Sequence, residues 1–157
     1  MDGDEHMTVL TYGTFDLFHY GHYNLLKRAA EMGDRLVVGI SSDEMCENKG
    51  KVPVLPEDKR REIVSNLRFV DTTILEHNMA QKVNDAVLYH ADIFVLGDDY
   101  RDIFPQMPEY EQLIGLGCKV VFLPRTLEVS TTQLKDKMYK QMQLDMNKSS
   151  IHAQTNK

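Results

Sequence analysis

Five short apolar runs alternate with segments of helical periodicity, and this alternation restricts the fold more than any other feature of the chain. The apolar runs cover residues 9–12, 34–40, 72–75, 93–96 and 119–123. Helical patterns cover residues 23–33, 57–67, 80–89, 107–117 and 133–144. Strands that alternate with helices form a parallel sheet covered on both faces. The sequence therefore predicts a single α/β domain with a doubly wound, five-stranded parallel sheet.

In such a sheet, ligands bind beyond the carboxyl ends of the strands, at the point where the strand order reverses. If the order is 3-2-1-4-5, the reversal lies between the first and fourth strands. The first strand is followed by Gly13-Thr14-Phe15-Asp16 and the fourth by Gly97-Asp98-Asp99-Tyr100. We therefore expect these two loops to be neighbours in a Rossmann-like sheet and to form one site.

The loop after the first strand continues into His19-Tyr20-Gly21-His22, where a helix is predicted to begin. Two imidazoles three residues apart can ligate a metal, act as acid and base, or donate hydrogen bonds to a phosphate. Gly13 and Gly21 let the backbone approach a ligand, and a helix N-terminus favours anions, so the pattern favours a phosphate site. It is neither the Gly-x-Gly-x-x-Gly dinucleotide pattern nor a Walker loop.

Basic side chains complete the candidate set: Lys49, Lys51, Arg60, Arg68 and Arg125. The chain shows no convincing nucleophile, because neither cysteine has an obvious base partner and no serine sits in a nucleophile elbow. Many cations without a nucleophile suit phosphoryl or nucleotidyl transfer, in which the protein positions phosphates and neutralises developing charge.

Composition excludes several other classes. The formal net charge of −6 argues against a general nucleic-acid binder. No apolar run is long enough to span a bilayer and no secretory signal opens the sequence, so we expect no membrane insertion. Cys46 and Cys118 lack metal or redox spacing and are expected to be free thiols of a cytoplasmic protein.

We expect the folded domain to cover residues 8–144. Residues 1–7 are polar and acidic and are predicted to be a flexible tail, either native or added. Residues 145–157 are predicted to be a flexible C-terminal tail. Within the last predicted helix, Leu134, Met138 and Met142 share one stripe, and we expect this stripe to pack against the domain.

The segment from Gly13 to His22 resembles the His-x-Gly-His signature of the nucleotidyltransferase superfamily, and in particular the cytidylyltransferases that act on glycerol 3-phosphate. Four further segments are similar to that family and follow in the same order: Lys49-Gly50-Lys51, Arg68-Phe69-Val70-Asp71, Gly97-Asp98-Asp99-Tyr100, and Arg125-Thr126 with Ser130-Thr131-Thr132. The resemblance implies that CTP and an alcohol monophosphate, here glycerol 3-phosphate, give a CDP-alcohol and pyrophosphate, with Mg²⁺ accompanying CTP. It further implies a homodimer and a role in teichoic acid or capsule synthesis.

The resemblance also implies roles for individual residues. Catalytic roles are expected for His19, His22, Lys49, Lys51 and Arg125. Besides the two histidines and Arg125, nucleotide contacts are expected from Gly13, Thr14, Phe15, Asp16, Gly97, Asp99, Ser130 and Thr131. Contacts with the acceptor are expected from Lys49, Lys51, Arg60, Arg68 and Tyr100. Metal ligands stay unassigned.

Three features depart from the family pattern and leave the acceptor open. Glu128 stands where the family shows glycine, Tyr100 replaces a common tryptophan, and residues 101–117 form a longer segment than in short bacterial enzymes. The alternatives are the same chemistry on phosphocholine, phosphoethanolamine or ribitol 5-phosphate, or with ATP as donor. A nucleotide-binding module without catalysis is the remaining alternative, to which Glu128 points.

Overall fold

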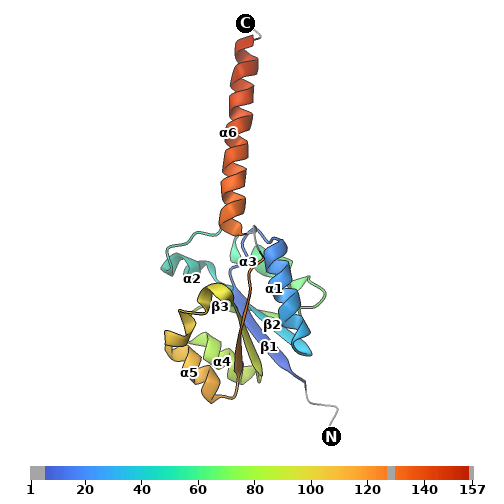
Figure 1. Ribbon diagram of the computed structural model, residues 1–157, viewed down its shortest axis with the longest axis vertical. Helices are drawn as coiled ribbons and strands as arrows, with labels where there is room; N and C mark the ends of the chain where they lie inside the picture. Colours follow the sequence, from blue (N-terminus) through green and yellow to red (C-terminus); the bar gives the residue numbers. More distant parts are fainter. Residues whose placement is uncertain (1–5, 127–129, 156–157) are drawn as a thin grey trace.

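The computed structural model describes residues 6–126 and 130–155, and Figure 1 shows a sheet with helices on both faces. Five strands form the sheet in the order β3-β2-β1-β4-β5, and every neighbouring pair is parallel. Their bounds are β1 Thr8–Gly13, β2 Arg35–Ser41, β3 Thr72–Glu76, β4 Ile93–Gly97 and β5 Lys119–Leu123. The predicted fold class and the assumed strand order are both confirmed.

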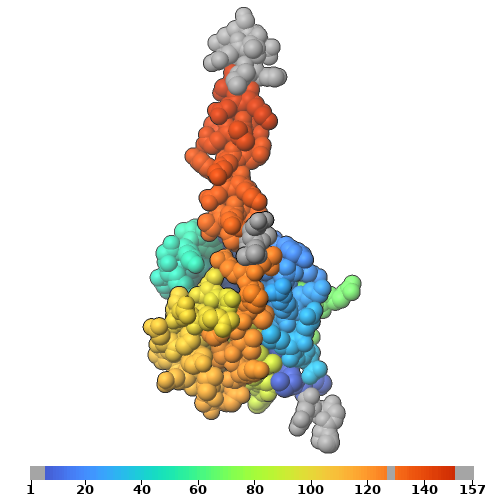
Figure 2. All heavy atoms as spheres, in the orientation of Figure 1, coloured from blue at the N-terminus to red at the C-terminus, as the bar shows by residue number. Residues whose placement is uncertain are grey.

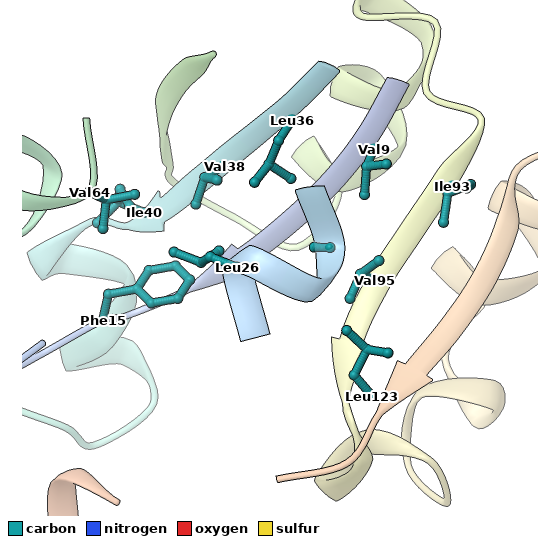
Figure 3. Packing of buried hydrophobic residues seen from close by; sticks show 11 residues of the cluster. Val9, Phe15, Leu26, Leu36, Val38, Ile40, Val64, Ile93, Val95 and Leu123 are labelled. Carbon is teal, nitrogen blue, oxygen red and sulfur yellow. The ribbon is translucent and has the colours of Figure 1, made fainter. Parts of the chain in front are cut away.

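Alternate residues of each central strand pack on opposite faces of the sheet. On one face Val9, Val38 and Val95 pack with residues of α1 (Tyr20–Glu31) and α3 (Glu57–Ser65), and Figure 3 shows this cluster. On the other face Leu10 and Phe94 pack with residues near and within α4 (Gln81–Leu88) and α5 (Pro108–Gly115). Burial on both faces explains why these strands read as continuous apolar runs.

Residues in the left-handed region end two of these helices. His90, with φ of +53°, follows α4, and the amide of Ala91 donates to the carbonyl of Ala86. Gly117, with φ of +84°, follows α5 in the same way. Such a residue lets the chain turn back while satisfying the last helical carbonyls, so each helix returns the chain to the next strand.

One short helix was not predicted. The polar stretch after β2 forms α2 (Asp43–Asn48), whose first turn is capped by the Ser42 hydroxyl accepting from the Met45 amide at 3.1 Å. The helix buries Met45 and Cys46, which are its apolar positions. A helix of six residues is too short to show a helical repeat of apolar residues in the sequence. Its start could have been recognised, because Ser42 followed by two acidic residues is a typical N-terminal signal.

The C-terminal helix corrects two predictions. α6 (Thr131–Thr155) continues beyond Leu144 into the predicted tail of residues 145–157, because no glycine or proline interrupts it before Thr155. Figures 1 and 2 show α6 projecting from the domain. The expected packing of Met138 and Met142 is therefore wrong, since these side chains are 54% and 62% exposed.

At the other end, Met7 belongs to the ordered part of the predicted N-terminal tail. Its amide donates to the Asp34 carboxylate at 2.9 Å, and its carbonyl accepts from the amides of Asp34 and Arg35. Residues 1–5 lie outside the described residues. Within the described ranges, α6 included, no helix is long and apolar enough to cross a membrane.

Candidate active site

Two adjoining cavities open at the carboxyl edge of the sheet, where the order reverses between β1 and β4. The first has a volume of about 520 Å³ and the second of about 410 Å³. Six residues line both cavities: Tyr12, Gly13, Thr14, Lys51, Gly97 and Tyr100. The loops after strands one and four are therefore neighbours, as predicted.

The turn after β1 adopts an uncommon backbone conformation that buries an aromatic ring beneath the site. Phe15 and Leu17 have φ values of +52° and +50°, which cost free energy in non-glycine residues. Gly13 is required there, because a Cβ at this position would lie 2.7 Å from the Phe15 ring. Phe15 is only 3% exposed, and its ring packs nearly perpendicular to the His22 ring, with the ring centroids 5.4 Å apart. Its side chain thus supports His22 from the core, and because Phe15 also lines the first cavity, its predicted nucleotide contact stays a prediction.

The two histidines cap the start of α1. His19 is the N-cap residue, and its Nδ1 accepts a hydrogen bond from the Gly21 amide at 3.0 Å. His22 is the third helical residue, and its Nδ1 accepts from the His19 amide at 3.2 Å. The rings stack with centroids 3.8 Å apart. Because Nδ1 is an acceptor in both rings, each neutral imidazole carries its proton on Nε2. Both residues line the first cavity, so the Nε2–H group of each ring can donate a hydrogen bond to a ligand there.

Burial keeps both histidines neutral near pH 7. Desolvation lowers the pKa of His22 to about 4, with a further lowering by His19, while Asp16 opposes the shift. Desolvation and then the Arg125 cation lower the pKa of His19. Each ring is therefore a donor through Nε2 without being a fixed cation in the free protein.

Asp16 holds the loop that carries Lys51. Its two carboxylate oxygens accept from the amides of Leu55 and Val54 at 3.0 and 2.8 Å, and Lys135 Nζ lies 3.6 Å away. The side chain is 5% exposed. These contacts make Asp16 a positioning residue for the loop that carries Lys51, which lines both cavities. Asp16 itself also lines the first cavity, so its predicted nucleotide contact stays a prediction.

Arg60 corrects a predicted acceptor contact. It is fully buried, and its guanidinium donates to the carbonyls of Leu55, Thr14 and Ser41 and to the Asp43 carboxylate at 2.7–2.9 Å. It therefore joins the turn after β1 to the end of β2 and to α2. In the sequence, Arg60 follows a proline and two acidic residues in the first turn of a helix. This pattern predicts the helix but not the direction of the Arg60 side chain.

Arg68 lies away from both cavities. It is exposed and lies between α3 and the start of β3, the opposite edge of the sheet from the cavities. It is absent from the described residues that line either cavity. The predicted acceptor contact of Arg68 thus has no support from this chain.

The ends of β4 and β5 form the far wall of the first cavity. Arg125 Nη1 lies 3.2 Å from Asp99 Oδ2, and both side chains are about half exposed, so they can still contact a ligand. A Cβ on Gly97 would meet no atom within 4 Å, which keeps space open next to both cavities. Asn24 on α1 donates to the Thr126 hydroxyl at 3.1 Å and ties this wall to the histidine helix. Asn24 was missed in the sequence, where it reads as an ordinary polar helix position.

The start of α6 also reaches the first cavity. Ser130 and Thr131 both line it, as predicted. The Ser130 hydroxyl accepts from the Gln133 amide at 3.0 Å and caps the helix, and the Thr131 hydroxyl donates to the Asp16 carbonyl at 2.9 Å. Two helix N-termini, of α1 and α6, therefore meet at this cavity, which favours a polyanion. Glu128 lies outside the described residues.

The second cavity adds residues that sequence reasoning missed. The predicted Lys49 and Lys51 both line it, and so do Glu76 and Lys82. Glu76 ends β3 and is therefore a carboxylate at the carboxyl end of a strand, which is the same signal that identified Asp99. Lys82 begins α4 and reads in sequence as a solvated residue.

The cations and helix N-termini around the cavities suit a phosphate-bearing ligand, and comparisons with known proteins identify the family of the chain. A family profile described as cytidylyltransferase-like matches residues 10–137. The chain belongs to the cytidylyltransferase-like family.

Relatives in this family match almost from end to end. A glycerol-3-phosphate cytidylyltransferase of Bacillus spizizenii is 44% identical over 130 residues, which cover 83% of this chain and 95% of that protein. One from Staphylococcus aureus is 39% identical over 131 residues, covering 83% and 94%. The solved structure of a lipopolysaccharide core biosynthesis protein from Thermoplasma volcanium superposes with a TM-score of 0.62 at 31% identity, covering 78% of this chain and 98% of that one.

The half-buried His22 of this cytidylyltransferase-like chain predicts a pH dependence of stability. The His22 pKa is about 4 in the folded protein and near 6.5 in the unfolded chain, so the unfolded chain binds the extra proton between these values. Acidification from pH 8 to pH 5 should lower the free energy of unfolding through this residue by about 2 kcal/mol. In urea denaturation, the free energy of unfolding of His22→Gln should fall between pH 8 and pH 5 by that amount less than the free energy of unfolding of the wild type. Equal losses in the two proteins would contradict the buried neutral ring.

The arginines give a second prediction. Arg60→Met should lower the free energy of unfolding by about 3–5 kcal/mol, because it leaves Asp43 and three carbonyls without their donor. Arg68→Met, the matched exposed control, should change it by less than about 0.5 kcal/mol. Urea denaturation near pH 7 measures both values. An Arg60 variant as stable as the Arg68 variant would refute the structural role of Arg60.

Proposed function

We propose that the protein is a glycerol-3-phosphate cytidylyltransferase, which joins CTP and glycerol 3-phosphate to give CDP-glycerol and pyrophosphate. The observation that carries this proposal is the stacked, neutral His19–His22 pair, which lines a cavity with Arg125 and Lys51 at two helix N-termini. The acceptor is taken from relatives of that printed name, which match over nearly their whole length.

The proposed reaction needs no protein nucleophile. An oxygen of the glycerol phosphate attacks the α-phosphorus of CTP, the bond from that phosphorus to the bridging oxygen breaks, and pyrophosphate leaves with the electron pair. The attacking phosphate is already ionised at neutral pH, so no general base is required. The protein accelerates this step by aligning two phosphates that repel each other and by stabilising the charge that develops between them.

We assign these tasks to donors around the first cavity. The Nε2–H groups of His19 and His22 donate to the phosphate oxygens of CTP. Arg125 and the N-terminus of α6 bind the leaving pyrophosphate, while Asp99 and Gly97 flank the nucleoside. Lys51 lines both cavities and Lys49 the second, so we propose that these two ammonium groups bind the acceptor phosphate at the junction.

We further propose that Mg²⁺ enters with CTP. In the described ranges, no three His, Cys, Asp or Glu side chains converge as a resident metal site. This fits an ion that is bound mainly by substrate phosphates and water, with one or two protein carboxylates. Asp99 is a half-exposed carboxylate on the first cavity and can supply such a ligand. When bound, the ion neutralises phosphate charge.

We propose that the protein acts in the cytoplasm as a homodimer. Both cysteines are free and buried, which suits a cytoplasmic enzyme. A homodimer is expected from the family resemblance, and the exposed Tyr139, Met142 and Met146 of α6 offer apolar surface for association. We propose that CDP-glycerol made here serves teichoic acid or capsule synthesis.

Pyrophosphate release tests the reaction directly. The full chain is incubated with Mg²⁺ and either CTP or ATP, against glycerol 3-phosphate, ribitol 5-phosphate, phosphocholine and phosphoethanolamine. Release that requires both CTP and glycerol 3-phosphate is expected. Release with a different pair would keep the reaction class and reassign the substrates. A protein that is thermally stabilised by CTP but releases nothing would be a binding module.

Conservative variants of the histidine pair test the catalytic assignment. Asn at an N-cap and Gln at the third position retain capping acceptors. His19→Asn and His22→Gln should therefore fold normally, yet each should lower kcat by about 10²–10³-fold, because each removes an Nε2 donor. His90→Asn, at an exposed left-handed position far from the cavities, is the control and should keep wild-type kcat. Near-wild-type turnover in both site variants would remove the phosphate-donor assignment.

A further inference from the structure

Lys135 lies in the second turn of α6 and lines the first cavity, and the reaction as described does not use it. α6 begins at Thr131, so Lys135 is four residues further on and occupies the same face of the helix. Both residues contact Asp16: the Thr131 hydroxyl donates to its carbonyl at 2.9 Å, and Lys135 Nζ lies 3.6 Å from its Oδ2. The fold therefore holds an ammonium group beside the turn that leads into the two histidines.

The ion pair between Lys135 and Asp16 does little for the stability of the fold. Both carboxylate oxygens of Asp16 already accept hydrogen bonds from the amides of Val54 and Leu55, so the carboxylate is satisfied without the ammonium. A separation of 3.6 Å is too long for a strong hydrogen bond, and the Lys135 side chain is 43% exposed. Exposed ion pairs contribute little to the free energy of unfolding. The Thr131 hydroxyl already ties α6 to Asp16, so the fold does not require a lysine at this position.

Arg125 is placed at the same cavity in a similar way. Its Nη1 lies 3.2 Å from Asp99, and its side chain is about half exposed. Each of the two cations thus rests against a carboxylate while it stays accessible from the cavity. An ammonium carries three N–H donors, so Lys135 can keep one toward Asp16 while the others donate to a ligand. The two cations come from different parts of the chain, the loop after β5 and α6, and can contact a ligand together.

The leaving pyrophosphate of the proposed reaction needs positive charge. Burial lowers the pKa values of His19 and His22 and keeps both rings neutral, so they donate hydrogen bonds without adding charge. In the described part of the lining of the first cavity, the lysine and arginine side chains are Lys51, Arg125 and Lys135. Since Lys51 is assigned to the acceptor phosphate, Arg125 and Lys135 remain for the pyrophosphate, on which negative charge grows as the bond breaks.

We propose that Lys135 is a further catalytic residue, whose ammonium group donates to the β- and γ-phosphates of CTP together with Arg125. This inference rests on the proposed cytidylyl transfer. Because these two phosphates become pyrophosphate, the contact strengthens as the bond to the α-phosphorus breaks and lowers the barrier as well as the dissociation constant. CMP lacks both phosphates and gains nothing from Lys135. The residue thus favours a nucleoside triphosphate over a monophosphate.

The test compares the binding of CTP and of CMP to the full chain with Mg²⁺, measured by isothermal titration calorimetry. Lys135→Met should weaken the binding of CTP by roughly tenfold or more and leave the binding of CMP unchanged, because it removes a charged donor to the two outer phosphates. Lys135→Arg should retain most of the affinity for CTP. The matched control is Lys137→Met, which removes an exposed charge from the opposite side of the same helix and should bind both nucleotides as the wild type does.

Steady-state kinetics provide a second measurement that does not depend on the affinity for CMP. In Lys135→Met, kcat should fall and KM for CTP should rise, while KM for the acceptor stays unchanged. The inhibition constant of added pyrophosphate should rise by roughly tenfold or more, because pyrophosphate loses the same charged donor. Lys137→Met should keep all of these constants at their wild-type values.

Thermal melting shows whether Lys135→Met is folded, and if it is not, Lys135→Gln, which keeps a polar group toward Asp16, takes its place. A folded variant that binds CTP as tightly as the wild type overturns the inference. An equal loss of affinity for CTP and CMP also overturns it, because Lys135 would then act only through Asp16. A wild type whose CTP affinity depends on Lys135 but which releases no pyrophosphate overturns the proposed transfer and leaves the phosphate contact standing. A wild type that binds ATP instead of CTP overturns the donor assignment alone, and ATP and AMP then replace CTP and CMP. A wild type that binds neither triphosphate overturns both.

Discussion

The first turn of any α-helix leaves backbone N–H groups without helical acceptors, and in α1 the acceptors are the Nδ1 atoms of two histidines. The rest of the site depends on this arrangement. It fixes the tautomer of both rings, stacks them and keeps them in the wall of the first cavity. Burial against Phe15 then keeps His22 neutral. One set of hydrogen bonds thereby starts the helix and orients the donors that serve the ligand.

Charge near the cavities divides between structure and ligand according to burial. Arg60 and Asp16 are almost completely buried and spend their hydrogen bonds on the chain itself, joining the turn after β1 to the loop before α3. Arg125 and Asp99 are about half exposed and face the first cavity. The chain thus surrounds an anion site with cations while holding an acidic net charge elsewhere, so net charge alone says little about the ligand.

Periodicity and strand ends predicted much of this molecule. Five apolar runs predict the sheet, and the rule for ligand sites in parallel sheets predicts that the loops at Gly13 and Gly97 are neighbours. What failed were statements that depend on the direction of one side chain. Arg60 and Arg68 look alike in sequence, yet one points into the protein and the other lies at the far edge of the sheet. The extent of α6 and the exposure of its methionines also depend on contacts that a local pattern does not contain.

The wall shared by the two cavities has a thermodynamic consequence. Six residues, among them Lys51 and Tyr100, line both sides, so an occupant that shifts or neutralises one of them in the first cavity alters the second. The free energies of filling the two cavities are therefore not independent, and any coupling between them is reciprocal. Whichever ligand enters first changes the affinity for the other by the same factor in either order of addition.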